Sequence, residues 1–450
     1  MPDYFKLSRG LTIRMKGAPE NKEIKIALPT EFAIYPDEFK GLTPKSMLKP
    51  GDLVKAGTPV FYSKDHPEIK FASPVSGILK DVVRGERRKI EAFIFESDGR
   101  YESEVFEKKT IETLTREDIL AKLTETCAWP FIRQRPYNII AQPESTPRDI
   151  FISGFDSAPL APDIELLIQE SASYLQAGIS VISKLTTGKI FIGLPQAKKG
   201  LSLFEKLNGV TVKYFSGPHP AGTLGVQIHH IAPLNKGEIV WTLQPEDVIF
   251  IGKLFAEGKY DVSKKIALAG SEFKNTGFVN TVTGASVVPF LENNISANDV
   301  RVISGHVLTG RSVGLKGHLG QYDRMVTVIP EGNHYEFLGW ALPGFNKFSH
   351  TRTFFSWMFP GKKYRLHTNL NGGERALVMT GEYEKVVPMD ILPQHLLKAI
   401  MIQDIELMEK LGIYEVTEEE LALCDFVCTS KTEVQQIVGK GIELMIKEMS

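Results

Sequence analysis

The chain has 450 residues, a formal net charge of −1, 42% apolar residues and 24% charged residues. This length suits roughly three domains of ~150 residues, the composition is that of a globular protein, and the neutral balance gives no indication of nucleic acid as a partner. No apolar run approaches the ~20 residues of a membrane-spanning helix, and the basic N-terminus lacks the apolar core of a secretory signal. We therefore expect a cytoplasmic protein that would need a protein partner to reach a membrane.

Residues 1–100 are predicted to form a β domain. The stretch 51–95 (GDLVKAGTPVFYSKDHPEIKFASPVSGILKDVVRGERRKIEAFIF) consists of short runs rich in Val, Ile and Phe that Gly-containing turns separate. The pattern resembles the barrel-sandwich hybrid of biotinyl and lipoyl domains, which present a cofactor-bearing lysine on a hairpin tip. The corresponding tip, residues 63–67, has no such lysine motif, so we expect the scaffold without the carrier chemistry.

Residues 101–148 are expected to form a helix followed by a linker. Thr115 and Asp118 have the spacing of a capping box before the apolar run ILAKL. Four prolines fall between Trp129 and Pro147, and such a density favours a linker.

Residues 149–262 alternate between strand and helix patterns. The runs DIFISG, KIFIGLP and VTVKYF have the character of short buried strands, and the stretches between them, including KGLSLFEKL, have helical spacing. This alternation predicts a Rossmann-like α/β domain with a parallel sheet. Ligands in such domains usually bind beyond the carboxyl ends of the strands.

The loop 215–225 (FSGPHPAGTLG) follows the last of these predicted strands. Its three glycines would let backbone N–H groups approach an anion or a flat ring. The next residues, VQIHHIAP, have a strand pattern, whereas a dinucleotide fingerprint requires a helix there, so we do not favour NAD or FAD. A structural turn and a loop that binds a partner or a ring remain as alternatives, and His219, held between Pro218 and Pro220, is the candidate recognition residue.

Four histidines are possible metal ligands by residue type. His229 and His230 are adjacent and on a strand would face opposite sides, while His306 and His318 fall in separate Gly-rich turns. None has the close spacing with further ligands that zinc sites show. We therefore expect no metal site.

Residues 263–335 are again rich in predicted strands. KKIALAG, DVRVISG and RMVTVIP are separated by Gly-rich turns, which predicts a β-grasp-like (SLBB) ligand-binding module.

Residues 336–385 are expected to be an aromatic-basic β segment. The stretch 344–365 (GFNKFSHTRTFFSWMFPGKKYR) interleaves aromatic with basic residues, a combination found at nucleic-acid, protein and membrane interfaces. The neutral total charge argues against nucleic acid. The alternatives are buried aromatics of a folded β segment and a docking surface for a membrane-embedded partner. The docking candidates are Phe354, Phe355, Trp357, Lys362 and Lys363.

Residues 386–450 are predicted to be helical. A long helix is expected at about 392–411, and two capping boxes, Thr417 with Glu420 and Ser430 with Glu433, predict helix starts. Cys424, Cys428 and Cys127 are the chain's three cysteines, one ligand short of an all-cysteine iron–sulfur cluster. We interpret Cys424 and Cys428 as a buried reduced pair, with a redox disulfide as the alternative.

No motif assigns catalytic residues. The sequence has no evident Ser-His-Asp, Cys-His or paired-carboxylate arrangement and no G-x-x-x-x-G-K-[ST] phosphate loop.

Five ordered blocks carry a resemblance to a known family. KPGDLVKAGTPVF, FASPVSGILKDVVRGERR, FSGPHPAGTLGVQIHHI, ISGHVLTGR and LALCDFVCTSKTE resemble the NqrA family, a subunit family of the Na+-translocating NADH:quinone oxidoreductases, over nearly the whole chain. The resemblance implies a complex that oxidises NADH, reduces ubiquinone or menaquinone and exports Na+. It implies a peripheral subunit on the cytoplasmic face of the bacterial inner membrane, without a transmembrane helix. Its implied partners are the other subunits, NqrB to NqrF, and especially the membrane subunit NqrB.

The resemblance also implies that this chain binds no cofactor, because FAD, FMN, riboflavin and the 2Fe-2S centre belong to partner subunits. The flavoprotein of respiratory complex I is a more distant relative and binds FMN through a Gly-rich loop with a four-cysteine cluster nearby. The corresponding loop here, residues 153–159, lacks that glycine density, and Cys424 and Cys428 resemble a remnant of the cluster.

Two interpretations of the chain's role stay open. The chain contributes to quinone binding or reduction, or it is a structural docking subunit with all quinone chemistry in membrane partners; a stand-alone flavin or biotinyl enzyme is disfavoured, and we expect the isolated chain to be inactive. The quinone- or partner-binding candidates are Phe215, Gly217, Pro218, His219, Pro220 and Gly222.

Overall fold

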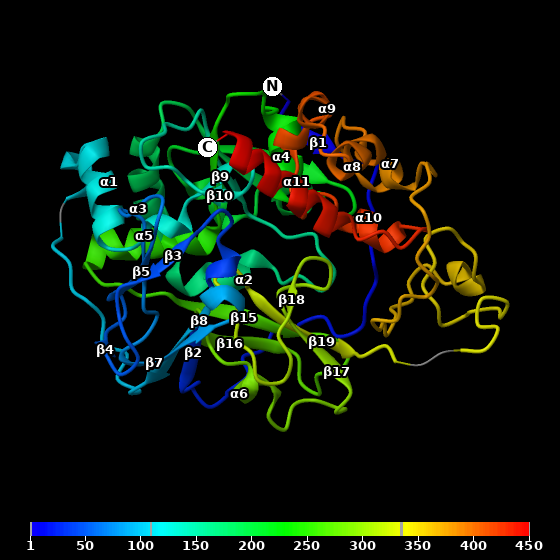
Figure 1. Ribbon diagram of the computed structural model, residues 1–450, viewed down its shortest axis with the longest axis horizontal. Helices are drawn as coiled ribbons and strands as arrows, with labels where there is room; N and C mark the ends of the chain where they lie inside the picture. The colour runs from blue at the N-terminus through cyan, green and yellow to red at the C-terminus, as the bar shows by residue number, and fades with distance from the viewer. Residues whose placement is uncertain (1, 109, 334–335, 450) are drawn as a thin grey trace.

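The computed structural model describes residues 2–108, 110–333 and 336–449. It contains a seven-stranded, a five-stranded, a four-stranded and a three-stranded sheet. The β domain and the five-stranded sheet lie below the seven-stranded sheet in Figure 1, the C-terminal helices cover the top, and an irregular lobe extends to the right. The α/β multidomain fold predicted from the sequence is confirmed.

The N-terminal β domain is a barrel-sandwich hybrid made of the four-stranded and three-stranded sheets. Its strands are β2 (Glu31–Ile34), β3 (Pro44–Ser46), β4 (Leu53–Val54), β5 (Pro59–Ser63), β6 (Lys70–Ala72), β7 (Gly77–Arg84) and β8 (Ile90–Ser97). In its core the ring of Phe61 stacks on Phe71 and Phe93, with centroids 4.4 and 4.6 Å away. Gly77 has φ 143°, and a Cβ there would lie 2.0 Å from the Glu96 carbonyl oxygen, so this turn requires glycine.

The first strand does not belong to this domain. β1 (Tyr4–Lys6) pairs in parallel with β13 (Thr211–Ser216) at the edge of the seven-stranded sheet, with Tyr4 opposite Tyr214. The expectation of one β domain over residues 1–100 is therefore wrong for this strand, whose partner lies too far along the chain for a local pattern to indicate it.

The seven-stranded sheet has the order β1-β13-β12-β11-β14-β9-β10. Its other strands are β9 (Arg133–Arg135), β10 (Ile139–Ile140), β11 (Ile150–Ser153), β12 (Ile190–Pro195) and β14 (Val240–Leu243). The first five strands in this order run parallel to one another, and β9 is antiparallel to both of its neighbours, β14 and β10. The expected linker is thus wrong: residues 129–147 contain this hairpin, with Pro136 in its turn, and Trp129 is fully buried.

Five helices flank this sheet: α1 (Arg116–Glu125), α2 (Ile164–Ile168), α3 (Ser173–Ile182), α4 (Leu224–Ile231) and α5 (Pro245–Glu257). The Thr115–Asp118 capping box at the start of α1 is confirmed. α4 replaces the strand expected for VQIHHIAP. Val226 and Ile228 alternate as in a strand, but Leu224, Ile228 and Ile231 have the spacing of one helix face. The helix expected for KGLSLFEKL is reduced to the 3-10 turn Leu203–Lys206.

The strand-rich module beyond residue 262 is confirmed as a five-stranded sheet, β16-β15-β19-β17-β18. Its elements are β15 (Ser263–Ala269), β16 (Gly277–Val282), β17 (Val300–Ser304), β18 (Arg311–Ser312), β19 (Met325–Pro330) and the short helix α6 (Val288–Leu291).

The C-terminal region is helical, with boundaries that differ from the expected ones. The helices are α7 (Glu382–Val386), α8 (Pro393–Met401), α9 (Ile405–Lys410), α10 (Ala422–Val427) and α11 (Val434–Met449). The single long helix expected over 392–411 breaks between α8 and α9, where Gln403 has φ 57°. Ser430 does not cap α11, because its hydroxyl donates to the Ala376 carbonyl (2.9 Å) and the Asp425 carboxylate accepts from the first amides of that helix. Cys424 and Cys428 are buried and free, as expected.

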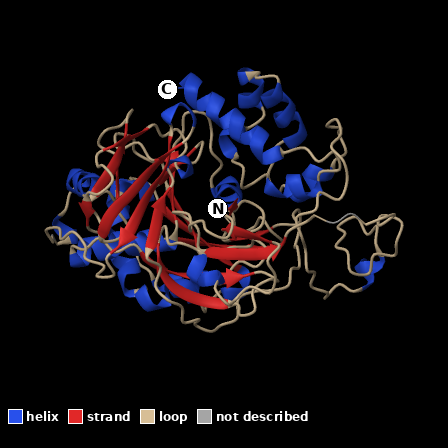
Figure 2. Ribbon diagram, turned by 60° about the horizontal axis from the view of Figure 1, so that its bottom comes forward, coloured by secondary structure: helices blue, strands red, loops and turns tan. Residues whose placement is uncertain are grey.

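Residues 336–365 form what we call the aromatic lobe. Its described residues contain no named strand, only the 3-10 turn Phe355–Met358, so the expected β segment is wrong. Figures 1 and 2 show a chain of loops that projects from the body of the molecule. The lobe is fastened at its base, where Tyr364 forms a bridge with Met15 and the ring of Phe348 lies 5.7 Å from that of Phe426.

Candidate functional site

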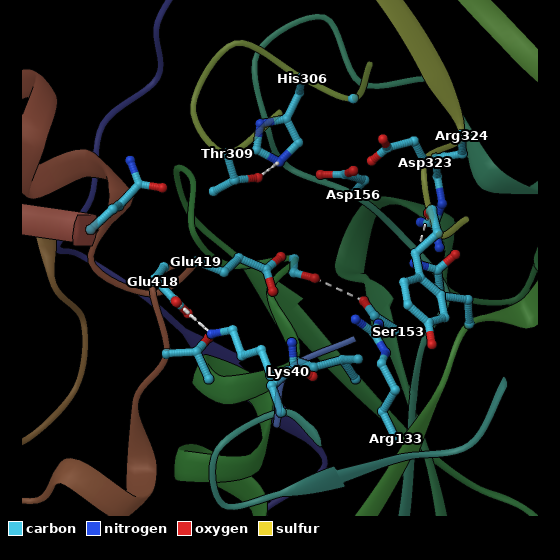
Figure 3. A pocket seen from close by; sticks show the side chains of 18 of the residues that line it. Lys40, Arg133, Ser153, Asp156, His306, Thr309, Asp323, Arg324, Glu418 and Glu419 are labelled. Carbon is cyan, nitrogen blue, oxygen red and sulfur yellow. Dashed lines mark hydrogen bonds and ion pairs between the residues drawn. The ribbon is translucent and has the colours of Figure 1, made fainter. Parts of the chain in front are cut away.

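A cavity of about 710 Å³ lies at the carboxyl ends of the parallel strands. Ser153 ends β11, Leu243 ends β14, and Gly222 belongs to the loop after β13, and all three line the cavity. Residues of the five-stranded module and of α11 close its other sides (Figure 3). The cavity is therefore at the edge where ligands bind in this class of fold.

Charged side chains from the β domain, the α/β domain, the five-stranded module and the C-terminal region line this cavity. Lys40 comes from the β domain, Arg133 from β9, and Asp323 and Arg324 from the turn before β19. The lining charges are Lys40, Arg133, Arg324, Lys440, Asp156, Asp323, Glu418, Glu419 and Glu443. Lys40 and Glu418 form an ion pair across the opening, so the cavity suits a polar ligand or proton exchange better than a purely apolar group.

Asp156 and His306 lie side by side at one end of the cavity (Figure 3). Burial alone would raise the pKa of Asp156, but the neighbouring His306 and Arg324 and the Ala158 amide lower it overall. Burial lowers the pKa of His306. The Leu308 amide donates to Nδ1 of His306 (3.2 Å), which places the imidazole proton on Nε2, 3.1 Å from the Thr309 hydroxyl.

Two carboxyl groups in or beside the cavity titrate near neutral pH. Burial, with the Glu420 carboxylate close by, raises the pKa of Glu419 to about 7, although its side chain keeps 41% of its surface exposed. Burial likewise raises the pKa of Glu38 to about 7, against the attraction of Arg311. Groups of this kind exchange protons at physiological pH.

Arg133 forms no ion pair with a carboxylate among the described residues. Its guanidinium lies 4.5 Å from the centre of the Tyr322 ring, and its buried Nε has no hydrogen-bond partner there. This side chain faces the cavity in Figure 3 and is the group best placed to contact an anionic or carbonyl ligand.

The structure places the predicted loop only partly at this site. Gly222 lines the cavity, but His219 is 3% exposed and its Nδ1 lies 3.0 Å from the Ser157 hydroxyl. Its ring meets His306 edge-on with centroids 6.3 Å apart, and burial lowers the pKa of His219 to about 4. His219 thus stands behind His306 in the cavity wall. Of the other candidates, Phe215 is buried, Gly217 packs on Leu7, and Pro218 and Pro220 hold the turn.

The N-terminus of α4 is occupied by a carboxylate of the chain itself. Glu420 accepts from the Gly225 amide (3.0 Å) and from the amide and hydroxyl of Thr417, and it pairs with Arg135 at 3.1 Å. The helix that a dinucleotide fingerprint requires is present, so the strand predicted here is wrong. A phosphate at this loop is disfavoured instead by Glu420, whose carboxylate fills the anion position at the helix end.

The paired histidines have other partners. His229 lies on α4, where its Nδ1 is 2.7 Å from Glu415 and its Nε2 accepts from the Asp390 amide, and Nε2 of His230 is 2.8 Å from the Pro388 carbonyl oxygen. His318 contacts the Tyr35 hydroxyl at 3.0 Å. These rings tie the C-terminal helices and the β domain to their neighbours and do not converge on a shared metal position.

The docking candidates lie on the aromatic lobe and are mostly exposed. Phe355 and Trp357 are 50% and 51% exposed, and Lys363 is exposed, while Phe354 and Lys362 are half-buried. Ordinary core residues are buried, so the alternative of a buried β segment does not hold. Sequence reasoning missed Phe337 and Trp340 on the same lobe, which are 90% and 77% exposed.

Sequence reasoning also missed most of the cavity. Its lining includes residues from segments far apart in the sequence: Lys40, Arg133, Glu418 and Glu419. Near them, the capping-box spacing of Thr417 and Glu420 is the one sequence pattern that we recognised.

Comparison with known proteins gives consistent results along the chain. Three family models match: "NqrA N-terminal barrel-sandwich hybrid domain" over residues 5–98, "NqrA second alpha/beta domain" over 114–260 and "NQRA C-terminal domain" over 265–314. A solved NAD+-reducing [NiFe]-hydrogenase overlaps with a TM-score of 0.39 at 11% identity, over 75% of this chain and 62% of that chain, which is too weak a likeness to support a conclusion.

Curated relatives cover almost the full length. The NqrA subunit of the Na(+)-translocating NADH-quinone reductase of Pasteurella multocida is 37% identical over 98% of this chain and 99% of its own length. The corresponding proteins of Hahella chejuensis and Neisseria meningitidis are each 36% identical over 99% of this chain and 100% of their own length. The chain therefore belongs to the NqrA family, a subunit family of the Na+-translocating NADH-quinone reductases.

Proposed function

We propose that this chain attaches to the membrane subunits of its reductase, above all NqrB, through the aromatic lobe, and contributes protons and positioning to quinone reduction on the cytoplasmic face of the bacterial inner membrane. The observation that carries this proposal is the coincidence of an exposed aromatic lobe with a charged cavity lined by titratable groups, among them Glu419 with a pKa raised to about 7.

The attachment rests on the lobe. No helix among the described residues is long and apolar enough to cross a membrane, so a subunit of a membrane complex needs a surface for its partners. The lobe exposes a set of large apolar side chains: Phe337, Leu338, Trp340, Leu342, Phe345, Phe355, Trp357, Met358 and Phe359. An apolar surface of this kind marks an interaction site, and its aromatic members are typical interface anchors.

The contribution to quinone chemistry rests on the cavity. A quinone that accepts electrons must also take up protons, and His306, Asp156 and Glu419 are titratable groups that line the cavity. Arg133 has the charge to hold a quinone carbonyl oxygen, and the buried His219 and Ser157 support His306 from behind. Electrons would arrive from flavins of the partner subunits.

We propose that the chain binds no flavin or cluster of its own, with FAD, FMN, riboflavin and the 2Fe-2S centre in partner subunits. Glu420 at the N-terminus of α4 supports this proposal, since a nucleotide phosphate would have to displace it from Gly225 and Arg135.

A purely structural role is the second candidate, and the polarity of the cavity favours it. An isoprenoid quinone tail needs an apolar channel, whereas charged and polar side chains dominate this lining.

Substitution in the assembled complex separates the two functions. The variants His306→Ala and His219→Ala are compared with the control His395→Ala, an exposed histidine on α8, and NADH oxidation and quinone reduction are assayed separately. We expect the two cavity variants to lose quinone reduction while electron entry from NADH persists. Wild-type rates of both reactions with normal assembly would contradict a role in quinone reduction and support the purely structural role.

A further inference from the structure

The hairpin between β5 and β6 meets the α/β domain at a cluster of three metal-ligating side chains. His66 and Glu68 lie on this hairpin, and Glu144 lies on a turn of the α/β domain. One ligand atom from each residue falls within 4.8 Å of the other two. We propose that this cluster, the hairpin triad, binds a divalent transition-metal ion that joins the β domain to the α/β domain.

The spacing fits a single ion after small side-chain rotations. Zinc binds imidazole nitrogen and carboxylate oxygen at ~2.0–2.2 Å, so ligands of one ion lie roughly 3–4 Å apart. The Nδ1 of His66 and a Glu68 oxygen are already 3.4 Å apart, and Glu144 has to approach only slightly.

The backbone holds both turns in place. In the hairpin, the Ser63 amide donates to the Ile69 carbonyl (3.0 Å) and the Ile69 amide to the His66 carbonyl (2.9 Å). In the opposite turn, the amide of Ser145 donates to the Gln142 carbonyl (3.0 Å). The guanidinium of Arg116, on α1, donates to the Ser145 carbonyl (2.8 Å). The ligand-bearing turns are therefore preorganised, which reduces the entropy that ion binding must overcome.

Apart from His66, no cation compensates the carboxylates of the triad among the described residues. Among the described residues, no lysine or arginine forms an ion pair with Glu68 or Glu144, and Glu68 pairs only with His66. Carboxylate oxygens within 4.8 Å of each other repel, and a dication bound between them would turn this repulsion into attraction. One imidazole with two carboxylates is a donor set that suits Zn²⁺ and Mn²⁺, with water completing the coordination.

Zn²⁺ titration of the full-length chain by calorimetry tests the proposal. The variants are His66→Ala and Glu144→Gln, and the matched control is His395→Ala, which removes an exposed histidine far from the triad in sequence. We expect one Zn²⁺ per wild-type and control chain, binding at least tenfold weaker in either triad variant, and a zinc-dependent rise in melting temperature that only wild type and control show.

Circular dichroism without zinc verifies that the variants fold. If His66→Ala does not fold, Glu144→Gln, an exposed and nearly isosteric change, still tests the site. An anomalous peak at the zinc edge between the hairpin and the turn at residue 144 would support the site directly. Equal zinc affinity in wild type and in the double variant His66→Ala/Glu144→Gln would overturn the proposal, as would a stoichiometric ion located elsewhere.

Discussion

The cavity and the aromatic lobe invert the usual distribution of side chains. Nine charged residues line a cavity inside the molecule, while the lobe carries aromatic and aliphatic side chains that are roughly half exposed or more. Around the cavity some charges are paired with residues from other domains, such as Lys40 with Glu418. The apolar side chains of the lobe are not covered in this way, which is why we assign the lobe to a protein partner and the cavity to chemistry within this chain.

The largest expected effect concerns the buried pair beneath the cavity. Glu420→Ala should lower the free energy of unfolding by about 3–5 kcal/mol, because it leaves the Arg135 charge buried without its partner; the side chains of Glu420 and Arg135 are 0% and 4% exposed. Chemical denaturation measures the change. The exposed Glu406→Ala should stay within about 0.5 kcal/mol of wild type. A similarly small loss for Glu420→Ala would show that the charges beneath the cavity contribute no more to stability than exposed ones.

The next effect depends on pH. Burial raises the pKa of Asp247 from 3.8 to about 7, so the folded state binds more protons than the unfolded state across this range, and unfolding free energy is lost as pH rises through it. Asp247→Asn keeps an acceptor for the Gln244 amide and should be more stable than wild type by about 1–4 kcal/mol at pH 8. At acidic pH, below the unfolded pKa of 3.8, this advantage should vanish. The exposed Asp299→Asn should show no such crossover; a pH-independent difference for Asp247→Asn would contradict the assignment.

Substitutions in the aromatic lobe should weaken attachment to the membrane partners without lowering the stability of the chain. The double variant Phe355→Ala/Trp357→Ala should release the chain from membranes containing the rest of the complex, since each anchor is worth about 2 kcal/mol, or roughly thirtyfold in affinity. Co-sedimentation measures attachment, and thermal melting should match wild type. Leu53→Ala, at an 82% exposed site on the β domain, is the control. A lower melting temperature with attachment intact would show that the lobe is part of the core.

The last prediction is that no cofactor adds to the mass of the chain. Although the β domain is a barrel-sandwich hybrid, its hairpin lacks a carrier lysine motif, so intact-mass spectrometry should find no biotin or lipoate on Lys64 or Lys70. An added mass equal to either cofactor would give the hairpin a carrier function and refute this prediction.

Local patterns in the sequence are enough to predict most elements but not the cavity. The strands β11, β12 and β13 follow from short apolar runs, and the cap of α1 follows from the Thr115–Asp118 spacing. α4 is ambiguous in the sequence, because Val226 and Ile228 alternate as in a strand while Ile228 and Ile231 have helical spacing. The Lys40–Glu418 pair joins residues 378 positions apart, and no periodicity connects such positions. The aromatic and basic composition of residues 344–365 indicates an interface. Their irregular backbone could not be predicted, because loops have no periodic pattern of apolar residues.

The position of β1 affects how the protein is made. Tyr4 pairs with Tyr214, so the first strand leaves the ribosome long before the strand beside which it belongs. At ~5–20 residues per second, this delay is roughly 10–40 s. During that time the β domain, whose contacts are local, has its whole sequence available and can fold, while the N-terminal strand waits unpaired. The seven-stranded sheet is then closed at its edge by a strand made much earlier than its neighbour, and this makes completion of the sheet a late event in biosynthesis.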